Sequence, residues 1–255
     1  MGLWTYEHAV SLIPSVVVMV ALTLLLRRWL IHKSYKVRII PMQILAVILL
    51  IIEAGKQILS LQRGYDLYHL PFHFCSLFIF MVPIMAFYKG KHQHTVRGIT
   101  AALCGAVFSL MLIYPDLIYS KWNVLNYFKD YFSFHTVTFH NLVMLAFLLI
   151  PALQLHQPQP KGEVKAIVLF VIAFCAVATA MSYLLKTNFA GFYTCNIPAL
   201  ETVRQAVEQS LGRLPAIFVY VSILTVVNIV YVYGAYWLYR WLQNIFRKQG
   251  KTALV

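Results

Sequence analysis

The sequence predicts an all-α, polytopic membrane protein with seven transmembrane helices, the N-terminus outside and the C-terminus in the cytoplasm. Hydrophobic residues make up 61% of the chain and charged residues only 11%, whereas a soluble domain carries about 25% charged residues. The apolar residues form seven runs, most of them close to the roughly 20 residues that a helix needs to cross a bilayer. The cations are concentrated in alternate loops between these runs.

The seven runs account for nearly the whole chain. We expect the 255 residues to form a single transmembrane domain, 1–255, because seven spans leave no room for a second core. The third run is short and the last is long enough to tilt. Before the last run, residues 200–211 are expected to form a short helix on the outer face. The predicted spans are residues 9–30, 39–61, 72–88, 96–118, 134–155, 164–185 and 215–242.

The distribution of charge predicts the orientation. The stretch from Arg27 to Arg38, the loop around Lys89 and Lys91, and the C-terminal tail hold most of the net charge of +13. Basic loops face the cytoplasm, so the N-terminus is outside. The cations lie in short patches beside apolar runs, which is typical of contact with anionic lipid headgroups. We therefore expect membrane lipids as partners and no nucleic acid.

Four polar residues lie within the second run: Glu53, Lys56, Gln57 and Ser60. Their spacing of i, i+3, i+4 and i+7 places them on one face of a helix. Ionisable groups are costly inside a bilayer and usually face the interior of a helix bundle. This stripe is therefore either a functional surface or a Glu53–Lys56 ion pair that only fixes packing.

The third run begins with a candidate nucleophile. Pro71 suits the first turn of a helix, which would place Cys75 about one turn inside, near the positive end of the helix dipole. A cysteine in this setting, with His73 nearby, can become a nucleophile. The alternative is a small buried side chain that only packs.

The fifth run begins with two histidines, His135 and His140. Five positions correspond to about 140° around a helix of 3.6 residues per turn, so we expect the two rings to face different grooves. His140 lies deeper, on the face of Thr136 and Met144, and is either a base or a hydrogen-bonded packing residue. His135 is expected nearer the interface, where a partly hydrated histidine needs no special partner.

Four of these residues fall in one layer, the outer half of the bilayer. At about 1.5 Å per residue, Cys75 and Lys56 lie roughly 6 and 8 Å from the outer ends of their runs, and His140 and Glu53 roughly 10 and 12 Å. Independent packing residues would have no reason to share a layer. We therefore expect a common pocket that opens outward.

Two motifs carry a resemblance to a known family. The stretch His69-Leu-Pro-Phe-His-Phe-Cys75 before the third run, and Phe134-His…Phe-His140-Asn141 in the fifth, resemble the YwaF-like family of bacterial integral membrane proteins. That family is similar to transmembrane protein 164, an acyltransferase of ether phospholipids. The acidic Glu53 and the loop that contains Asn196-Ile-Pro198 also look like the family.

The resemblance implies an acyl-transfer site with Cys75 as the nucleophile and His140 as its base, in a phospholipid acyltransferase or acyl hydrolase. This chemistry requires no cofactor. The resemblance also implies a multi-pass protein of the bacterial cytoplasmic membrane. The remaining polar residues are candidates for substrate binding: Glu53, Lys56, His73, His135 and Asn141.

Other classes of function stay open. A transporter or lipid-binding protein without chemistry would use the layer of Glu53 and Lys56 as a substrate site. A metal-dependent hydrolase would need a histidine cluster, and residues 215–242 contain no histidine, so we assign no metal ligands. A disulfide between Cys75 and Cys195 would silence the nucleophile, and the sequence leaves this pairing open.

Overall fold

The computed structural model describes residues 4–195 and 198–252, which leaves Asn196 and Ile197 of the loop motif outside the described residues. Every regular element in the described residues is helical. In chain order these elements are α1 (Tyr6–Leu30), α2 (Tyr35–Arg38), α3 (Ile40–Gln62), the 3-10 helices η1 (Leu67–His69) and η2 (Cys75–Leu77), α4 (Phe78–Phe87), α5 (Gln93–Ile113), η3 (Pro115–Leu117), α6 (Lys121–Leu125), α7 (Tyr131–Ala152), α8 (Pro160–Leu185), α9 (Pro198–Leu211) and α10 (Arg213–Thr252).

Six helical segments in the described residues are long and apolar enough to cross a membrane. They are α1, α2 together with α3, α5, α7, α8 and α10. This finding confirms the prediction of an all-α membrane protein. A continuous apolar run folds as a helix in lipid because each backbone group must then find its partner within the segment. The short helix expected before the last run is also present, as α9.

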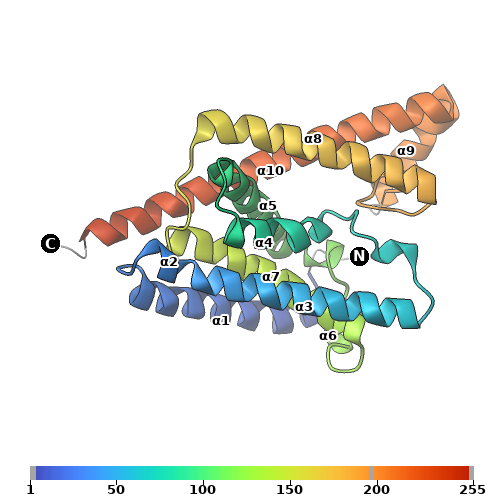
Figure 1. The fold of residues 1–255 in the computed structure, drawn as a ribbon. Coiled ribbons are helices and arrows are strands. Elements are labelled where there is room, and N and C mark those ends of the chain that lie inside the picture. The colour runs from blue at the N-terminus through green and yellow to red at the C-terminus, as the bar shows by residue number, and fades with distance from the viewer. Residues whose placement is uncertain (1–3, 196–197, 253–255) are drawn as a thin grey trace.

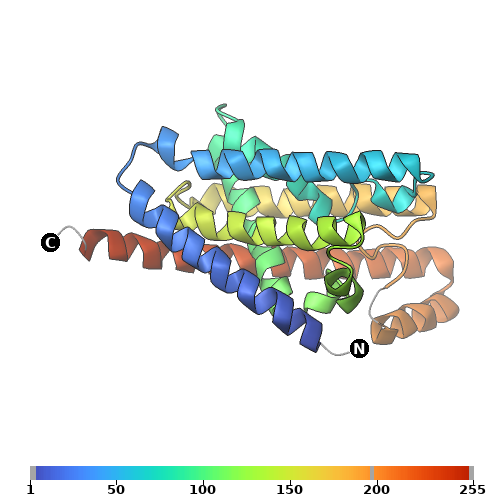
Figure 2. The same ribbon diagram turned by 90° about the horizontal axis from the view of Figure 1, so that it is seen from below.

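The long helices form two layers with α5 between them (Figure 1). Helices α1, α3 and α7 lie side by side in one layer, and α8 and α10 lie in the other. Helix α5 crosses the centre obliquely and contacts α7, α8 and α10 (Figure 2). The N-terminus and α9 lie at one end of the molecule, and the C-terminus and α2 lie at the opposite end.

The third run, residues 72–88, differs from its predicted form. The helix begins only at Cys75, so the prediction that Pro71 opens a helix is wrong. Leu70 is extended, as a residue before proline favours, and the Phe72 N–H bonds back to the Leu70 carbonyl oxygen. Together η2 and α4 are therefore shorter than the six spans, and Cys75 stands at the first helical residue.

Helix α5 is buried on all sides from Arg97 to Val107, and most of these residues are small, which lets transmembrane helices approach one another. At Gly105, an added Cβ atom would lie 2.8 Å from the Phe147 ring of α7 and 3.2 Å from the Ala235 carbonyl oxygen of α10. This glycine therefore sets how closely α7 and α10 pack against α5. The small residues of this stretch are each at most 1% exposed: Thr100, Ala101, Ala102, Cys104 and Ala106.

A buried polar cluster joins α8 to α10 at the end of the molecule where the C-terminus lies. Glu163, in the first turn of α8, is only 2% exposed. One of its carboxylate oxygens lies 2.9 Å from His156 Nε2, and the other accepts a hydrogen bond from the Tyr236 hydroxyl. The Tyr239 hydroxyl donates to the His156 carbonyl oxygen. The cluster thus supplies partners for a carboxylate that would otherwise be unpaired in the core.

We predict that Gly105→Ala lowers the stability of the folded bundle. The new methyl group meets an aromatic ring and a backbone oxygen, and such overpacking costs about 1–3 kcal/mol. The measurement is the thermal unfolding midpoint of the purified protein. Gly234→Ala in α10 is the matched control, because its Cβ would meet nothing within 4 Å. Equal midpoints for the two variants would contradict the close approach at Gly105.

Candidate active site

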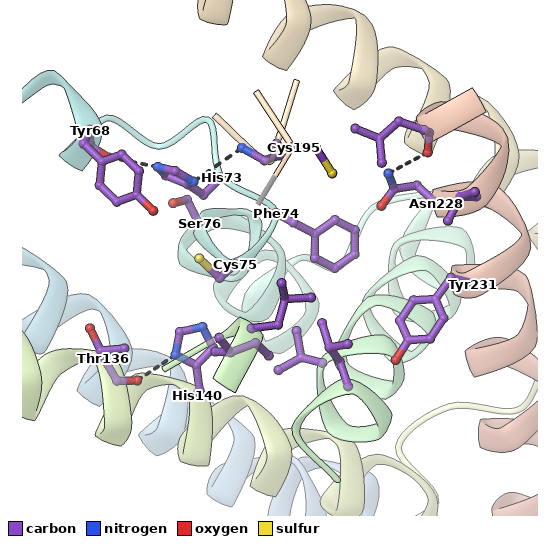
Figure 3. Close-up of a pocket in the computed structure, with 18 of the residues that line it drawn as sticks. Tyr68, His73, Phe74, Cys75, Ser76, Thr136, His140, Cys195, Asn228 and Tyr231 are labelled. Atoms are coloured by element: carbon purple, nitrogen blue, oxygen red, sulfur yellow. Dashed lines mark hydrogen bonds between the residues drawn. The ribbon is translucent and has the colours of Figure 1, made fainter. Parts of the chain in front are cut away.

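A cavity of about 670 Å³ opens between α3, the segment before α4, α7 and α10. Most of the polar residues selected from the sequence line it, which gives one end of the cavity a polar wall (Figure 3). Polar residues of the second, third and fifth runs thus line one cavity. Those lining residues are Glu53, Lys56, His69, His73, Cys75, His135 and His140.

The carboxylate of Glu53 is the centre of the polar wall and is 6% exposed. Its Oε1 lies 2.7 Å from Lys56 Nζ and accepts a hydrogen bond of 2.7 Å from Gln57 Nε2. Its Oε2 lies 2.8 Å from His135 Nε2. A buried carboxylate is tolerated where donors surround it in this way. The network therefore joins α3 to α7 and neutralises the charge of Lys56 at the cavity wall.

The same face of α3 holds the segment that leads to Cys75. Gln57 Nε2 also donates to the His69 carbonyl oxygen, at 3.0 Å, and the Tyr65 hydroxyl donates to Gln57 Oε1. Ser60 Oγ lies 2.6 Å from His69 Nδ1. The His69 ring in turn stacks on Phe132 of α7. The stripe predicted on the second run is therefore both an ion-pair network and an anchor for this segment.

Cys75 carries a free thiol that is partly accessible at the cavity. Its backbone N–H makes no hydrogen bond to a backbone carbonyl in the described part of the chain. Cys195 also carries a free thiol and lines the same cavity. The disulfide that the sequence left open between these two residues is therefore not formed in this structure.

His140 presents one ring nitrogen to the cavity and is 6% exposed. Its Nδ1 lies 2.6 Å from the Thr136 carbonyl oxygen. Because a carbonyl oxygen can only accept, Nδ1 carries the proton and a neutral ring would have its lone pair on Nε2. The ring extends from α7 toward the segment that bears Cys75 (Figure 3). Within the described residues, no hydrogen bond joins the thiol to this ring.

Whereas in His140 the donor is Nδ1, in His73 the other ring nitrogen, Nε2, is the donor. Its Nε2 donates to the Tyr68 carbonyl oxygen at 3.0 Å, and its Nδ1 accepts from the Ala190 N–H at 3.5 Å. Because Nδ1 accepts from a backbone N–H, it carries no proton, and the ring is neutral in this arrangement. Both ring nitrogens are therefore occupied, and His73 links the segment before α4 to the loop after α8.

Two expectations about the fifth run differ from the structure. His135 and His140 both line the cavity, so the prediction that they face different grooves is wrong. The cavity lies between several helices and faces a wide arc of the α7 surface. Two side chains about 140° apart around the axis of α7 can therefore both reach it. His135 is also buried at 7% exposure and bonded to Glu53, where we expected a hydrated ring. Asn141 does not line the cavity.

The other wall of the cavity is mostly apolar and belongs mainly to α10, whose residues were not among the candidates from the sequence. Its lining residues repeat at the i, i+3, i+4 and i+7 spacing of one helix face. From Ala216 to Tyr231 this face is about 22 Å long at 1.5 Å per residue. The spacing alone does not identify a cavity wall in the sequence, because apolar residues that face lipid and apolar residues that face a cavity follow the same helical pattern. The face consists of Ala216, Val219, Tyr220, Ile223, Leu224, Val227, Asn228 and Tyr231.

The rim of the cavity at the end nearest α9 is polar again. Arg204 of α9 binds Glu201 through Nε at 2.8 Å and Nη2 at 2.6 Å, and Glu208 through Nη1 at 2.9 Å. The hydrogen bond from Arg204 lowers the pKa of Glu201 to about 2. Glu201 also accepts from the Cys195 N–H. The cation at the rim is therefore already paired.

The described residues contain no group of three or more His, Cys, Asp or Glu side chains that could hold a metal ion. Charged and hydrogen-bonding groups of the polar wall are instead paired with one another. The cavity presents a thiol, imidazole rings, an ammonium group and a carboxylate beside a mostly apolar channel.

Fold and site together define a multi-pass membrane protein whose helix bundle encloses a cavity with one polar and one apolar wall. The model of the TMEM164 family matches residues 3–236. The chain therefore belongs to the TMEM164 family. No curated protein and no solved structure matches it. The narrower resemblance to bacterial YwaF-like proteins stays a prediction.

We predict that Glu53→Gln strongly destabilises the bundle, because it leaves the Lys56 ammonium buried without its counter-charge. Breaking a buried pair in this way costs about 3–5 kcal/mol. The thermal unfolding midpoint measures this loss. Glu208→Gln is the control, since its pair with Arg204 is more exposed and such pairs contribute about 0–1 kcal/mol.

The double variant Glu53→Gln, Lys56→Met tests the cause of this loss. Removing both charges should recover most of the stability that Glu53→Gln loses. A double variant as unstable as the single one would show that the carboxylate acts through its bond to His135 and not through the charge of Lys56.

Proposed function

We propose that the chain is an intramembrane acyltransferase or acyl hydrolase that acts on phospholipids through Cys75 and His140. One observation carries the proposal: a free thiol and an imidazole whose Nε2 is unbonded line the same cavity. Membership of the TMEM164 family agrees with a function in the membrane. Lipid is the favoured substrate class because the long wall of the cavity is apolar.

In the first half of the reaction, His140 Nε2 takes the proton of the Cys75 thiol. The thiolate attacks the carbonyl carbon of a fatty acyl ester, and the C–O bond to the glycerol oxygen breaks. That oxygen takes the proton back from His140 and leaves as a lysolipid hydroxyl. The product is a thioester on Cys75. The absence of a thiol–imidazole hydrogen bond is compatible with this role, since such bonds often tighten only when substrate is bound.

In the second half, an acceptor hydroxyl gives its proton to His140 Nε2 and attacks the thioester carbonyl. The C–S bond breaks, and the thiolate recovers the proton from His140. A lysolipid acceptor makes the protein a transferase, and water makes it a hydrolase. Atoms, charges and protons balance over the two halves without any cofactor.

Charge on the carbonyl oxygen needs donors in both halves. Lys56 and the Cys75 backbone N–H are the best candidates, because Lys56 has further N–H groups beside its bond to Glu53 and the Cys75 N–H has no carbonyl partner. His73 and His135, which were candidates for substrate binding from the sequence, are less suited as donors to the carbonyl oxygen. The donor nitrogen of His73 is bonded to Tyr68, and the Nε2 of His135 is bonded to Glu53. These two histidines act as positioning residues.

The acyl chain is assigned to the apolar wall. The α10 face runs away from the polar residues along α5, where Val107 and Leu110 complete the lining. Burial of a long hydrocarbon chain along this face stabilises the bound lipid through the hydrophobic contacts of the cavity. The ester at the head of the chain then lies next to Cys75.

The orientation is part of the proposal. The cations favour a cytoplasmic location for the end that holds α2 and the C-terminus. The short Cys75–Phe87 helix, with the turns before it, then serves as a seventh crossing within the single domain. The cavity opens toward the outer leaflet, and the chain is a multi-pass protein of the bacterial cytoplasmic membrane.

A transporter or lipid-binding protein without chemistry is the second candidate. The observation in its favour is the Glu53–Lys56 pair at the cavity wall, which could bind both charges of a zwitterionic headgroup. In that case the thiol is dispensable and the carboxylate is not. Full activity in Cys75→Ser, together with loss of activity in the double variant Glu53→Gln, Lys56→Met at recovered stability, would decide for this alternative.

We predict a covalent acyl-enzyme at Cys75. The full-length protein is incubated in nanodiscs with a phospholipid that carries an alkyne-tagged acyl chain, and adducts are mapped by mass spectrometry. The adduct should lie on Cys75, be cleaved by neutral hydroxylamine as a thioester, and be absent in Cys75→Ser. His140→Ala should slow its formation by about 10²–10⁴-fold, the usual contribution of a general base.

Cys175→Ala is the matched control for this experiment. Cys175 is 1% exposed and does not line the cavity, so its replacement should leave the adduct unchanged. Acylation spread over several cysteines, or unchanged in His140→Ala, would contradict an activated thiol at Cys75.

We predict that Leu224→Trp shortens the acyl chains that are accepted. The indole fills part of the apolar channel, so transfer of a palmitoyl group should fall about tenfold or more relative to an octanoyl group, the scale on which apolar pockets discriminate. Competition between tagged lipids of the two chain lengths measures the ratio. An equal loss of transfer for the palmitoyl and octanoyl groups would show that the acyl chain does not bind along this face of α10.

A further inference from the structure

Two arginines at the other end of the molecule converge on one tyrosine. The guanidinium group of Arg97, near the start of α5, lies 4.8 Å from the centre of the Tyr35 ring. The guanidinium group of Arg38 lies 5.9 Å from the same ring. Tyr35 and Arg38 belong to α2, which lies at the same end as the C-terminus (Figure 1).

The cluster has polar atoms without partners. Arg97 is only 7% exposed, and in the described part of the chain its sole polar contact is the Tyr35 ring. Its Nε, the Nε of Arg38 and the Tyr35 hydroxyl are all buried without a hydrogen-bond partner. Arg38 uses one nitrogen, Nη1, to bind the Leu153 carbonyl oxygen. Buried polar groups are nearly always bonded, so three orphaned donors in one place call for a ligand.

No acidic side chain in the described residues is free to serve as that ligand. The sequence has eight acidic residues, all of them in the described part, and Glu163 alone lies at the end that holds α2. Its two oxygens are already engaged by His156 and Tyr236. A buried charge without a partner is strongly unfavourable. No acidic side chain in the described residues therefore supplies the counter-charge for Arg97, which leaves an external anion as its partner.

We infer that Tyr35, Arg38 and Arg97 form a binding site for the phosphate of an anionic phospholipid headgroup. Guanidinium groups match the geometry of phosphate oxygens, and a phenol O–H adds a third donor. The cluster lies between α2, which directly precedes α3, and the first turns of α5. This is the level at which basic pockets between helices bind lipid headgroups. The site is separate from the Cys75 cavity and does not rest on the proposed acyl transfer.

The test uses the full chain purified in a nonionic detergent, with the thermal unfolding midpoint as the measurement. We expect added phosphatidylglycerol to raise the midpoint by several degrees, and phosphatidylcholine to raise it much less. Arg97→Gln should lose most of this rise. Without lipid, Arg97→Gln should be at least as stable as the parent protein, because it removes an unpaired charge.

Two further variants separate a site from general charge attraction. Lys91→Gln removes the same charge from an exposed position in the loop before α5, and it should keep the full rise. Tyr35→Phe keeps both cations and the ring and should lose part of the rise. An equal rise in all variants, or an equal loss in Lys91→Gln, would overturn the site.

Inorganic phosphate provides the last arm. A rise with phosphate alone, lost in Arg97→Gln, would keep phosphate as the bound group but assign its source to the aqueous phase. Native mass spectrometry of the purified protein gives an independent readout. A phosphatidylglycerol adduct should be retained by the parent and Lys91→Gln proteins and reduced several-fold in Arg97→Gln.

Discussion

The buried carboxylate of Glu53 is the constraint on which the candidate site depends. A charged group within a membrane bundle persists only where donors surround it. Two of those donors come from its own helix, and the third is His135 of α7, so the bond fixes how α3 lies against α7. The neighbouring polar residues of α3 then hold His69. The hydrogen bonds that stabilise the Glu53 carboxylate thus also determine where the segment that bears Cys75 lies.

The two walls of the cavity come from parts of the fold with different demands. The polar wall is rigid, since almost every group in it is bonded to another. The apolar wall is one face of α10, held in place where Gly105 lets α10 and α7 approach α5. A reactive centre needs fixed groups, whereas a hydrocarbon chain needs only a continuous apolar surface. Helix α5 keeps these two surfaces at the spacing that makes a cavity between them.

The sequence predicts the spans well because a continuous apolar run in lipid has no other way to satisfy its backbone. It also predicts the α3 stripe, since the 3.6-residue period brings those residues to one face. It fails where tertiary packing decides. His135 and His140 share a cavity because several helices leave a wide opening beside α7. Pro71 lies in a turn and does not open a helix, because hydrogen bonds from α3 hold the segment before α4. The apolar face of α10 resembles any lipid-facing surface.

The length of α10 has a mechanical consequence. The helix has 40 residues, and its apolar run, residues 215–242, is about 42 Å long, against about 30 Å for the hydrocarbon core of a bilayer. A helix longer than its bilayer tilts, or the bilayer thickens around it. One face of this helix is also a wall of the cavity, so a change of tilt moves that wall. We therefore expect membrane thickness to affect the width of the cavity.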